Sequence, residues 1–202
     1  MKKTKKGMTL IEVIVAIGVF SIGMGLAVLL FVQSWNMYKI SFSTGSMQFV
    51  ASNGVQRIID SIRNAQRSEN GSYPIVSVDE NEIILYSNVD DDEEIEKIRF
   101  FYSGSGIVRE VRNSVFGTPP QYPAGYEISE EIIPYVINTA DTPLFSYYNN
   151  ENEKLTEPIS LIDVKMVKVD LYVDENINRD PESINIESFA SIRNLSQYEI
   201  SN

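Results

Sequence analysis

Residues 5–32 read KKGMTLIEVIVAIGVFSIGMGLAVLLFV, and this stretch decides the architecture of the first part of the chain. After Glu12 no charged side chain follows until Lys39. A helix of about 20 residues, rising about 1.5 Å per residue, spans the roughly 30 Å hydrocarbon core of a bilayer. The segment Val13–Val32 is therefore predicted to cross a membrane as a single helix.

Charge is distributed unevenly around this segment. Four of the 17 basic residues, the lysines at positions 2, 3, 5 and 6, precede it, so residues 8–202 keep 13 basic against 28 acidic residues, a net charge of −15. The positive-inside rule predicts that the lysine stub stays in the cytoplasm and that the chain after about residue 36 lies outside it. The overall charge of −11 argues against nucleic acid as a partner, and none is expected on the stub.

A cleaved secretory signal peptide is the alternative interpretation, because it also has a basic start and an apolar run. Gly25-Leu26-Ala27 offers a small-x-small cleavage site. Cutting there would leave the apolar Val28–Val32 as the new N-terminus, and the apolar run is longer than a usual signal core. We therefore favour the retained membrane helix.

The join between stub and apolar run places a small residue, Gly7, before a helix that carries one carboxylate, Glu12. An isolated ionised carboxylate inside the apolar phase costs several kcal/mol, so this charge needs a partner. Cleavage after Gly7 would give Met8 a cationic amine four residues before Glu12. That amine could pair within its own chain or with Glu12 of a neighbouring chain, and the second pairing would set the axial register between subunits.

Lys-Gly followed by Met-Thr-Leu-Ile-Glu-Val resembles the class III signal of type IV pilins and type II secretion pseudopilins. The resemblance implies that a prepilin peptidase cuts between Gly7 and Met8 and that the amine of Met8 is N-methylated. Met8 departs from the Phe that is most frequent at the first mature position of the family. The resemblance also implies that four residues act in assembly: Thr9, Leu10, Ile11 and Glu12.

The same resemblance implies a set of partners and a location. The partners are the prepilin peptidase, other pilin or pseudopilin subunits, the lipid bilayer and, indirectly, a membrane platform protein with its assembly ATPase. The implied location is the inner or cytoplasmic membrane, with a cytoplasmic N-terminus and an extracytoplasmic C-terminal domain, and then the pilus or pseudopilus.

Residues 8 to about 67 contain no proline, so one helix is predicted to continue beyond the membrane. An amphipathic part, about residues 44–67, is predicted to pack against a sheet because apolar residues recur at spacings of three and four. These residues are Met47, Val50, Ala51, Gly54, Ile58, Ile62 and Ala65.

Strands are predicted beyond residue 70 from β-branched and aromatic residues and from alternation. The predicted ranges are 82–86, 97–102, 107–112, 132–137, 161–173 and 183–192, with a hairpin turn at Ser103–Gly106 and a loop-rich insertion over 113–157. The order predicts an α+β fold in which a long N-terminal helix packs on an antiparallel β-sheet. The predicted domains are a leader (1–7), a transmembrane and assembly segment (8–38) and an extracytoplasmic pilin-like domain (39–202).

A finer resemblance involves segments in the later part of the chain. Val55–Ala65, Ile98–Tyr102 with Ile107–Arg112, and Ala190–Leu195 look like the J-type minor pseudopilin, a tip subunit of type II secretion, or related minor pilins. Their order along the chain, more than any one segment, carries this resemblance.

Composition argues against an enzyme. The chain has no histidine and no cysteine, which excludes thiol nucleophiles, imidazole bases, disulfides and ordinary zinc sites. Ser34, Ser41 and Ser43 lack an arranged base, and no glycine-rich phosphate loop is present. We predict no catalytic residue and no cofactor.

Two acidic segments bear on metal binding. Asp90–Glu94 could bind a divalent cation but is interpreted as a solvated hairpin loop. Asp174, Asn176, Asn178 and Asp180 have the spacing of a calcium loop without its glycine and its final glutamate, and are interpreted as a turn. No metal site is predicted.

Two classes of function follow from these observations. The first is a minor pilin or pseudopilin that enters a type IV pilus or type II secretion pseudopilus through its N-terminal helix. The second is a permanently anchored single-pass binding or receptor protein with an acidic extracytoplasmic domain. Cleavage after Gly7 distinguishes them.

Overall fold

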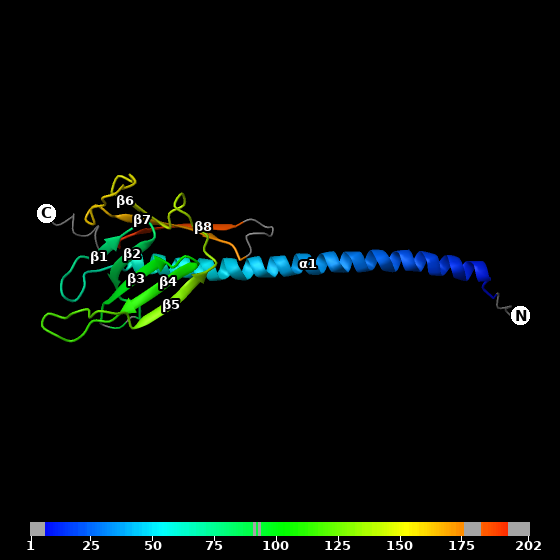
Figure 1. The fold of residues 1–202 in the computed structure, drawn as a ribbon, viewed down its shortest axis with the longest axis horizontal. Coiled ribbons are helices and arrows are strands. Elements are labelled where there is room, and N and C mark those ends of the chain that lie inside the picture. Colours follow the sequence, from blue (N-terminus) through cyan, green and yellow to red (C-terminus); the bar gives the residue numbers. More distant parts are fainter. Residues whose placement is uncertain (1–6, 91, 93, 176–182, 194–202) are drawn as a thin grey trace, which may run out of the picture. The chain divides into compact units, whose positions relative to one another are not determined.

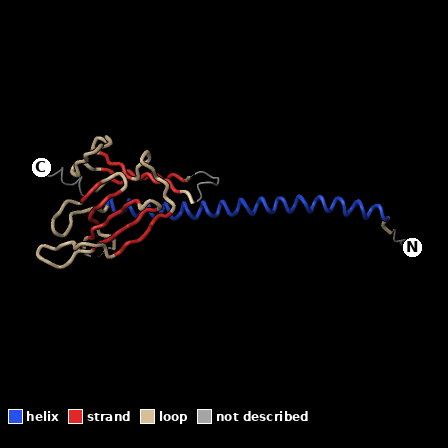
Figure 2. The backbone as a smooth tube through the Cα atoms, viewed as in Figure 1, coloured by secondary structure: helices blue, strands red, loops and turns tan. Residues whose placement is uncertain are grey.

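The structure is a computed structural model that describes residues 7–90, 92, 94–175 and 183–193; the predicted leader up to residue 6 lies outside these ranges. A single long helix, α1 (Leu10–Arg63), begins the described fold, and the strands follow it (Figure 1 and Figure 2). The chain divides into two compact units, residues 1–45 and residues 46–202. Helix α1 contributes to both units, and the strands belong to the second.

The larger sheet is an antiparallel meander in which each strand pairs with the next in sequence. The hairpin between its third and fourth strands turns at Gly104, whose φ of 96° lies in the left-handed region that glycine adopts without strain. Ser103 N–H donates to the Gly106 carbonyl at 2.9 Å, so the hairpin predicted here is confirmed. The five strands are β1 (Ile75–Val78), β2 (Glu82–Ser87), β3 (Glu96–Tyr102), β4 (Gly106–Arg112) and β5 (Ile128–Pro134).

The smaller sheet is also antiparallel and consists of β6 (Phe145–Tyr148), β7 (Met166–Val173) and β8 (Ile184–Ser191). The Tyr147 hydroxyl connects it to the β1–β2 hairpin, because two carbonyl oxygens share its one proton, that of Asp79 at 2.8 Å and that of Glu82 at 3.1 Å. Phe145 N–H adds a bond to the Glu80 carbonyl at 2.9 Å. The two sheets therefore share a core.

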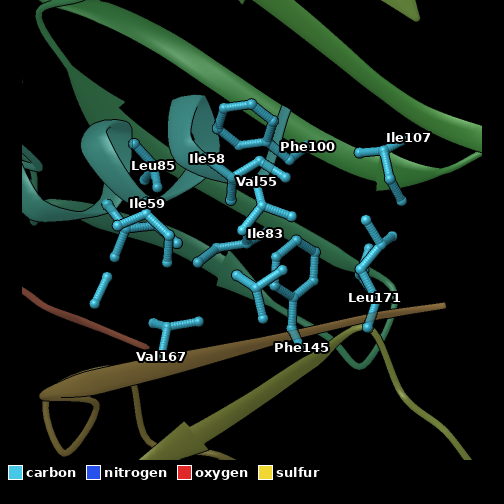
Figure 3. Close-up of a cluster of buried hydrophobic side chains, with 14 of the residues drawn as sticks. Val55, Ile58, Ile59, Ile83, Leu85, Phe100, Ile107, Phe145, Val167 and Leu171 are labelled. Atoms are coloured by element: carbon cyan, nitrogen blue, oxygen red, sulfur yellow. The ribbon is translucent and has the colours of Figure 1, made fainter. Parts of the chain in front are cut away.

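That core lies in the second unit and draws on the helix and both sheets. Figure 3 shows Val55, Ile58 and Ile59 of α1 among apolar side chains from β2, β3, β6 and β7. Fully burying one such side chain stabilises the fold by about 1.5–3 kcal/mol, so packing holds the second half of α1 in place. The predicted α+β fold, a long helix packed on antiparallel sheet, is confirmed.

Gly54 allows α1 to approach β5 closely. A Cβ at this position would overlap the Ile133 side chain and lie 3.2 Å from the Ile132 carbonyl oxygen. The stripe predicted on this helix is confirmed at four positions that are buried, Ala51, Gly54, Ile58 and Ile62. It is wrong at Val50, which is 41% exposed, and it omits two buried residues, Val55 and Ile59. The buried face therefore extends beyond the predicted stripe on the side of Val55 and Ile59.

The helix ends at Arg63, short of the predicted end near residue 67. The cause is pairing with the sheet, because Ala65 forms a β-bridge with Ser87 and Gln66 N–H donates to the Tyr86 carbonyl at 2.9 Å. The tertiary contact therefore overrides a helical pattern that would otherwise continue.

Other predicted bounds were also wrong. Strand β5 covers Ile128–Pro134 rather than 132–137, because Tyr135 adopts a φ of 59° and ends the strand. The strand predicted at 161–173 begins only at Met166, after a turn. Strands β1 and β6 were not predicted, and β6 lies inside the segment interpreted as a loop-rich insertion. Asn194 and Leu195, which end the last J-like segment, lie outside the described residues.

Candidate functional site

The first residues of α1 form a hydrogen-bonded cap. The helix begins at Leu10, which makes Thr9 the N-cap residue and Glu12 the third helical residue. Thr9 donates to Glu12 Oε2 through its N–H at 2.8 Å and through its hydroxyl at 3.0 Å, while Glu12 N–H donates to Thr9 Oγ1 at 3.4 Å. This reciprocal arrangement is a capping box.

The cap gives Glu12 a structural role in addition to the role in assembly predicted for it. Its carboxylate lies at the N-terminal end of α1, where the helix dipole favours a negative charge. The spacing Thr-x-x-Glu before an apolar run is the signal that predicts a capping box. Both bonds from Thr9 go to Oε2, and among the described residues no donor is assigned to Oε1. The carboxylate therefore keeps a second acceptor for another group.

Gly7 and Met8 precede the helix and are exposed. A Cβ placed on Gly7 would meet nothing within 4 Å, and Met8 is 71% exposed. Proteolysis concentrates at exposed positions outside regular structure, and the Gly7–Met8 bond satisfies that requirement. Leu10 and Ile11 are also exposed, so of the predicted site residues the structure brings together only Thr9 and Glu12. Cleavage, methylation and assembly at these positions stay predictions.

The apolar part of α1 that follows is exposed along its whole length. Its most apolar window of 18 residues has a mean hydropathy of 2.7, and none of that window is buried within the chain. Exposed apolar surface of this extent requires a cover, which lipid or another chain can supply. Within the described residues, one helix is long and apolar enough to cross a membrane. This helix indicates a single-pass membrane anchor.

A second cluster of ionisable groups lies on the connection between β2 and β3. Carboxylate oxygens of Asp90, Asp92 and Glu96 lie within 4.8 Å of one another. Burial raises the pKa of Glu96, Asp90 and Asp92 raise it further, and a hydrogen bond from Val89 N–H at 3.0 Å opposes the rise. Exposed acidic groups are common without an ion, and we assign no metal site to this cluster. Asp91 and Glu93 lie outside the described residues.

Of the acidic segment at residues 174–180, the structure describes only Asp174 and Glu175. Asp174 N–H donates to the Tyr135 carbonyl at 2.9 Å, at the end of β7. Asn176, Asn178 and Asp180 lie outside the described residues, so the turn predicted there stays a prediction.

An exposed, capped apolar helix that continues into an antiparallel α+β domain is consistent with a pilin-like fold, and its length and hydropathy indicate a single-pass membrane anchor. Residues 2–28 match the family model of the prokaryotic N-terminal methylation motif. The match confirms the prepilin-type motif predicted around Gly7 and Glu12, and together with the fold it is consistent with a pilin-like protein. The motif implies a structural subunit that prepilin peptidase processes and that assembles with other pilins. No curated protein matches the chain.

Proposed function

We propose that this protein is a minor pilin or pseudopilin, a non-enzymatic subunit that enters a type IV pilus or a type II secretion pseudopilus through helix α1. The observation that carries the proposal is the methylation motif at residues 2–28, located at the head of a helix whose apolar surface is exposed. A subunit that must leave the bilayer and enter a filament needs an apolar surface that suits both environments, and the first half of α1 has one.

Processing begins at the bond between Gly7 and Met8. Water adds across this amide, which frees a carboxylate on Gly7 and an amine on Met8. Methylation then replaces a proton of that amine with a methyl group from a methyl donor bound by the processing enzyme. The amine remains a cation, so the mature helix begins with a positive charge a short distance before Glu12.

Glu12 acts as the acceptor for that charge. In the uncut chain its Oε2 already accepts two bonds from Thr9, which satisfies part of the carboxylate within its own helix. A charge left unpaired in an apolar phase costs several kcal/mol, whereas a paired and hydrogen-bonded one is tolerated. Pairing between the amine of one chain and Glu12 of the next would fix the stagger of neighbouring helices.

The direction of insertion follows from charge. The lysines at positions 2, 3, 5 and 6 keep the leader in the cytoplasm, where the processing enzyme meets it, and residues 46–202 fold on the other side. Filament growth would draw its energy from a cytoplasmic ATPase acting through a membrane platform protein. The J-like segments favour a place at the tip.

The test is cleavage. The full chain, expressed with and without a prepilin peptidase, should lose seven residues only in the presence of the enzyme, and its mature mass should include an added methyl group on Met8. Gly7→Leu should leave the precursor uncut, because the enzyme must accept a small residue before the bond. Gly45→Leu is the matched control, since Gly45 has open space around it and lies far along the helix.

Two results would contradict the proposal. An uncut wild-type chain in the presence of active peptidase would favour the permanently anchored binding protein instead. Full processing of Gly7→Leu would place the cleavage site elsewhere.

A further inference from the structure

We propose that Trp35, Tyr38 and Lys39 form a lipid anchor that holds helix α1 at the headgroup level of the outer leaflet. The partner is the phospholipid interface, meaning the phosphates together with the first part of the acyl chains. The inference rests on the proposed function for two points, the direction of insertion and the removal of the leader.

The anchor is part of an aromatic ladder on one face of α1. Phe31, Trp35, Tyr38 and Phe42 follow one another at spacings of four, three and four, which places them on the same side of the helix. Their ring centroids are 6.4, 6.1 and 6.2 Å apart in sequence order. Lys39 Nζ lies 5.8 Å from the centroid of the Trp35 ring, so an ammonium group accompanies the ladder. Trp35 is 51% and Tyr38 60% exposed.

The position of the ladder along α1 matches the outer boundary of a bilayer. Counted from Val13, a span of about 20 residues covers roughly 30 Å of hydrocarbon and ends near Gln33, the first side chain after Ser21 that is polar. Trp35, Tyr38 and Lys39 follow within the next turns of the helix. Trp and Tyr are enriched at membrane interfaces, and a Lys near a helix end extends its ammonium toward the headgroups.

Loss of the leader makes this anchor necessary. The uncut chain has four lysines before the apolar segment, and cleavage after Gly7 removes all of them. The mature helix then has the Met8 amine and Glu12 at its inner end, and Lys39 is the first charged side chain beyond Glu12. The depth of the mature helix would therefore be fixed mainly by the residues at its outer end.

Lipid suits this face better than a neighbouring subunit does. The indole N–H, the phenol hydroxyl and the ammonium group each need a polar partner, which water and phosphate supply at the interface. A dry helix–helix contact at the same place would leave these groups buried without partners, at a cost of about 1–3 kcal/mol for each neutral group. Small residues, rather than aromatic ones, mark the close contacts of helices within a membrane.

The experiment uses the single tryptophan of the chain, Trp35, as a depth probe. The full chain, uncut and cut, is reconstituted in vesicles of phosphatidylcholine and phosphatidylglycerol that contain brominated acyl chains. We expect bromines near the carboxyl end of the acyl chain to quench Trp35 more strongly than bromines near the methyl end. The emission should also shift to shorter wavelength than in water. As a control, Ile22→Trp combined with Trp35→Phe moves the probe to the middle of the span and should reverse the order of quenching.

Lys39→Leu tests the role of the charge. It extends the apolar run, so Trp35 should move deeper and lose its preference for the shallow bromines. This change should be larger in the cut chain, because the uncut chain is still held by its four lysines. Lys154→Leu is the matched control, since it removes the same charge from an exposed position outside α1 and should change nothing.

Several outcomes would overturn the anchor. Equal quenching from both depths, stronger quenching by the deep bromines, or no quenching by either would each do so. If the fluorescence emission of Trp35 depended on the protein-to-lipid ratio and brominated lipid did not quench it, the aromatic ladder would contact a second copy of the chain instead of lipid. Failure of the proposed function is distinguishable, because it appears as an uncut chain whatever the depth of Trp35.

Discussion

Helix α1 is rich in apolar residues in both of its halves, yet only the half after Gly45 buries its apolar side chains in the described structure. Ile58, Ile59 and Ile62 have almost no exposed surface, whereas Ile17 and Ile22 of the first half are 60% and 69% exposed. The second half packs on the two sheets of its own unit, and the first half presents apolar surface all round. The same residue types thus stabilise the fold in the second half of α1, whereas in the first half they are available for contact with lipid or other subunits.

This difference predicts that changes in the two halves have different consequences. Substitutions in the first half should alter assembly without altering the stability of residues 46–202. Substitutions in the buried face of the second half should lower the stability of residues 46–202 without altering assembly. Ten of the 11 tyrosines lie beyond residue 45, so the tyrosine bands in the near-ultraviolet circular dichroism of the full chain in detergent report mainly on the second unit.

The largest effect is expected from Glu12→Ala. Cleavage after Gly7 should continue, but incorporation into filaments should be lost, because the amine of a neighbouring chain would have no carboxylate to pair with. The measurement is the amount of the chain in sheared filaments from cells that express the cognate assembly proteins. The urea midpoint of the second unit should stay unchanged.

Thr9→Val serves as a control for the cap, since it removes the hydroxyl bonds to and from Glu12 and keeps the carboxylate. It should weaken the capping box and reduce incorporation much less than Glu12→Ala does. Normal incorporation of Glu12→Ala would show that assembly needs neither the charge nor the cap of Glu12, whereas equal losses from Thr9→Val and Glu12→Ala would assign the effect to the cap.

The parts of this architecture that could be predicted from the sequence are those that local signals specify. The absence of proline defined the long helix, and alternating residues around Ser103–Gly106 defined the hairpin of β3 and β4. Strands β1 and β6 are only four residues long, and the Tyr147 hydroxyl links β6 to carbonyls of the distant β1–β2 hairpin. Contacts of that kind leave no periodic pattern in the sequence.

The candidate site residues also differ in whether local sequence signals could predict them. Gly7, Met8 and Glu12 lie within one short stretch of sequence, so a short motif identifies them, and the capping partner Thr9 could have been predicted from its spacing to Glu12. The cluster of Asp90, Asp92 and Glu96 depends on how the connection between β2 and β3 folds back. The acidic run predicts an exposed loop, but nothing in it predicts that Glu96 is buried.

A smaller effect, on stability, is expected from a matched pair of isoleucine substitutions. Ile58→Ala should destabilise the second unit by about 2–5 kcal/mol, because it removes a fully buried side chain from the core. Ile22→Ala makes the same chemical change on an exposed face of the first half and should leave the urea midpoint unchanged. Equal losses from both variants would mean that the first half also packs within the chain, which would remove the contrast between the halves.

The smallest effect concerns two glutamates, one in each unit. Glu12 is exposed and capped by Thr9, whereas Glu96 is buried at the start of β3, where burial and the charges of Asp90 and Asp92 raise its pKa above the ordinary 4.5. A raised pKa in the folded state means that protonated Glu96 contributes stability that is fully present below pH 4.5 and is lost as the pH rises through the raised pKa.

Glu96→Gln should therefore abolish this loss, because the amide stays neutral and its oxygen can still accept the bond from Val89 N–H. Relative to the wild type, the variant should gain stability as the pH rises from acid to neutral. Urea midpoints across that range check the result, with the exposed Glu151→Gln as the control. Parallel pH profiles for the wild type and Glu96→Gln would mean that Glu96 ionises in the folded protein as easily as in the unfolded chain. The contrast with Glu12 would then lie in position along the chain and not in the environment of the carboxylate.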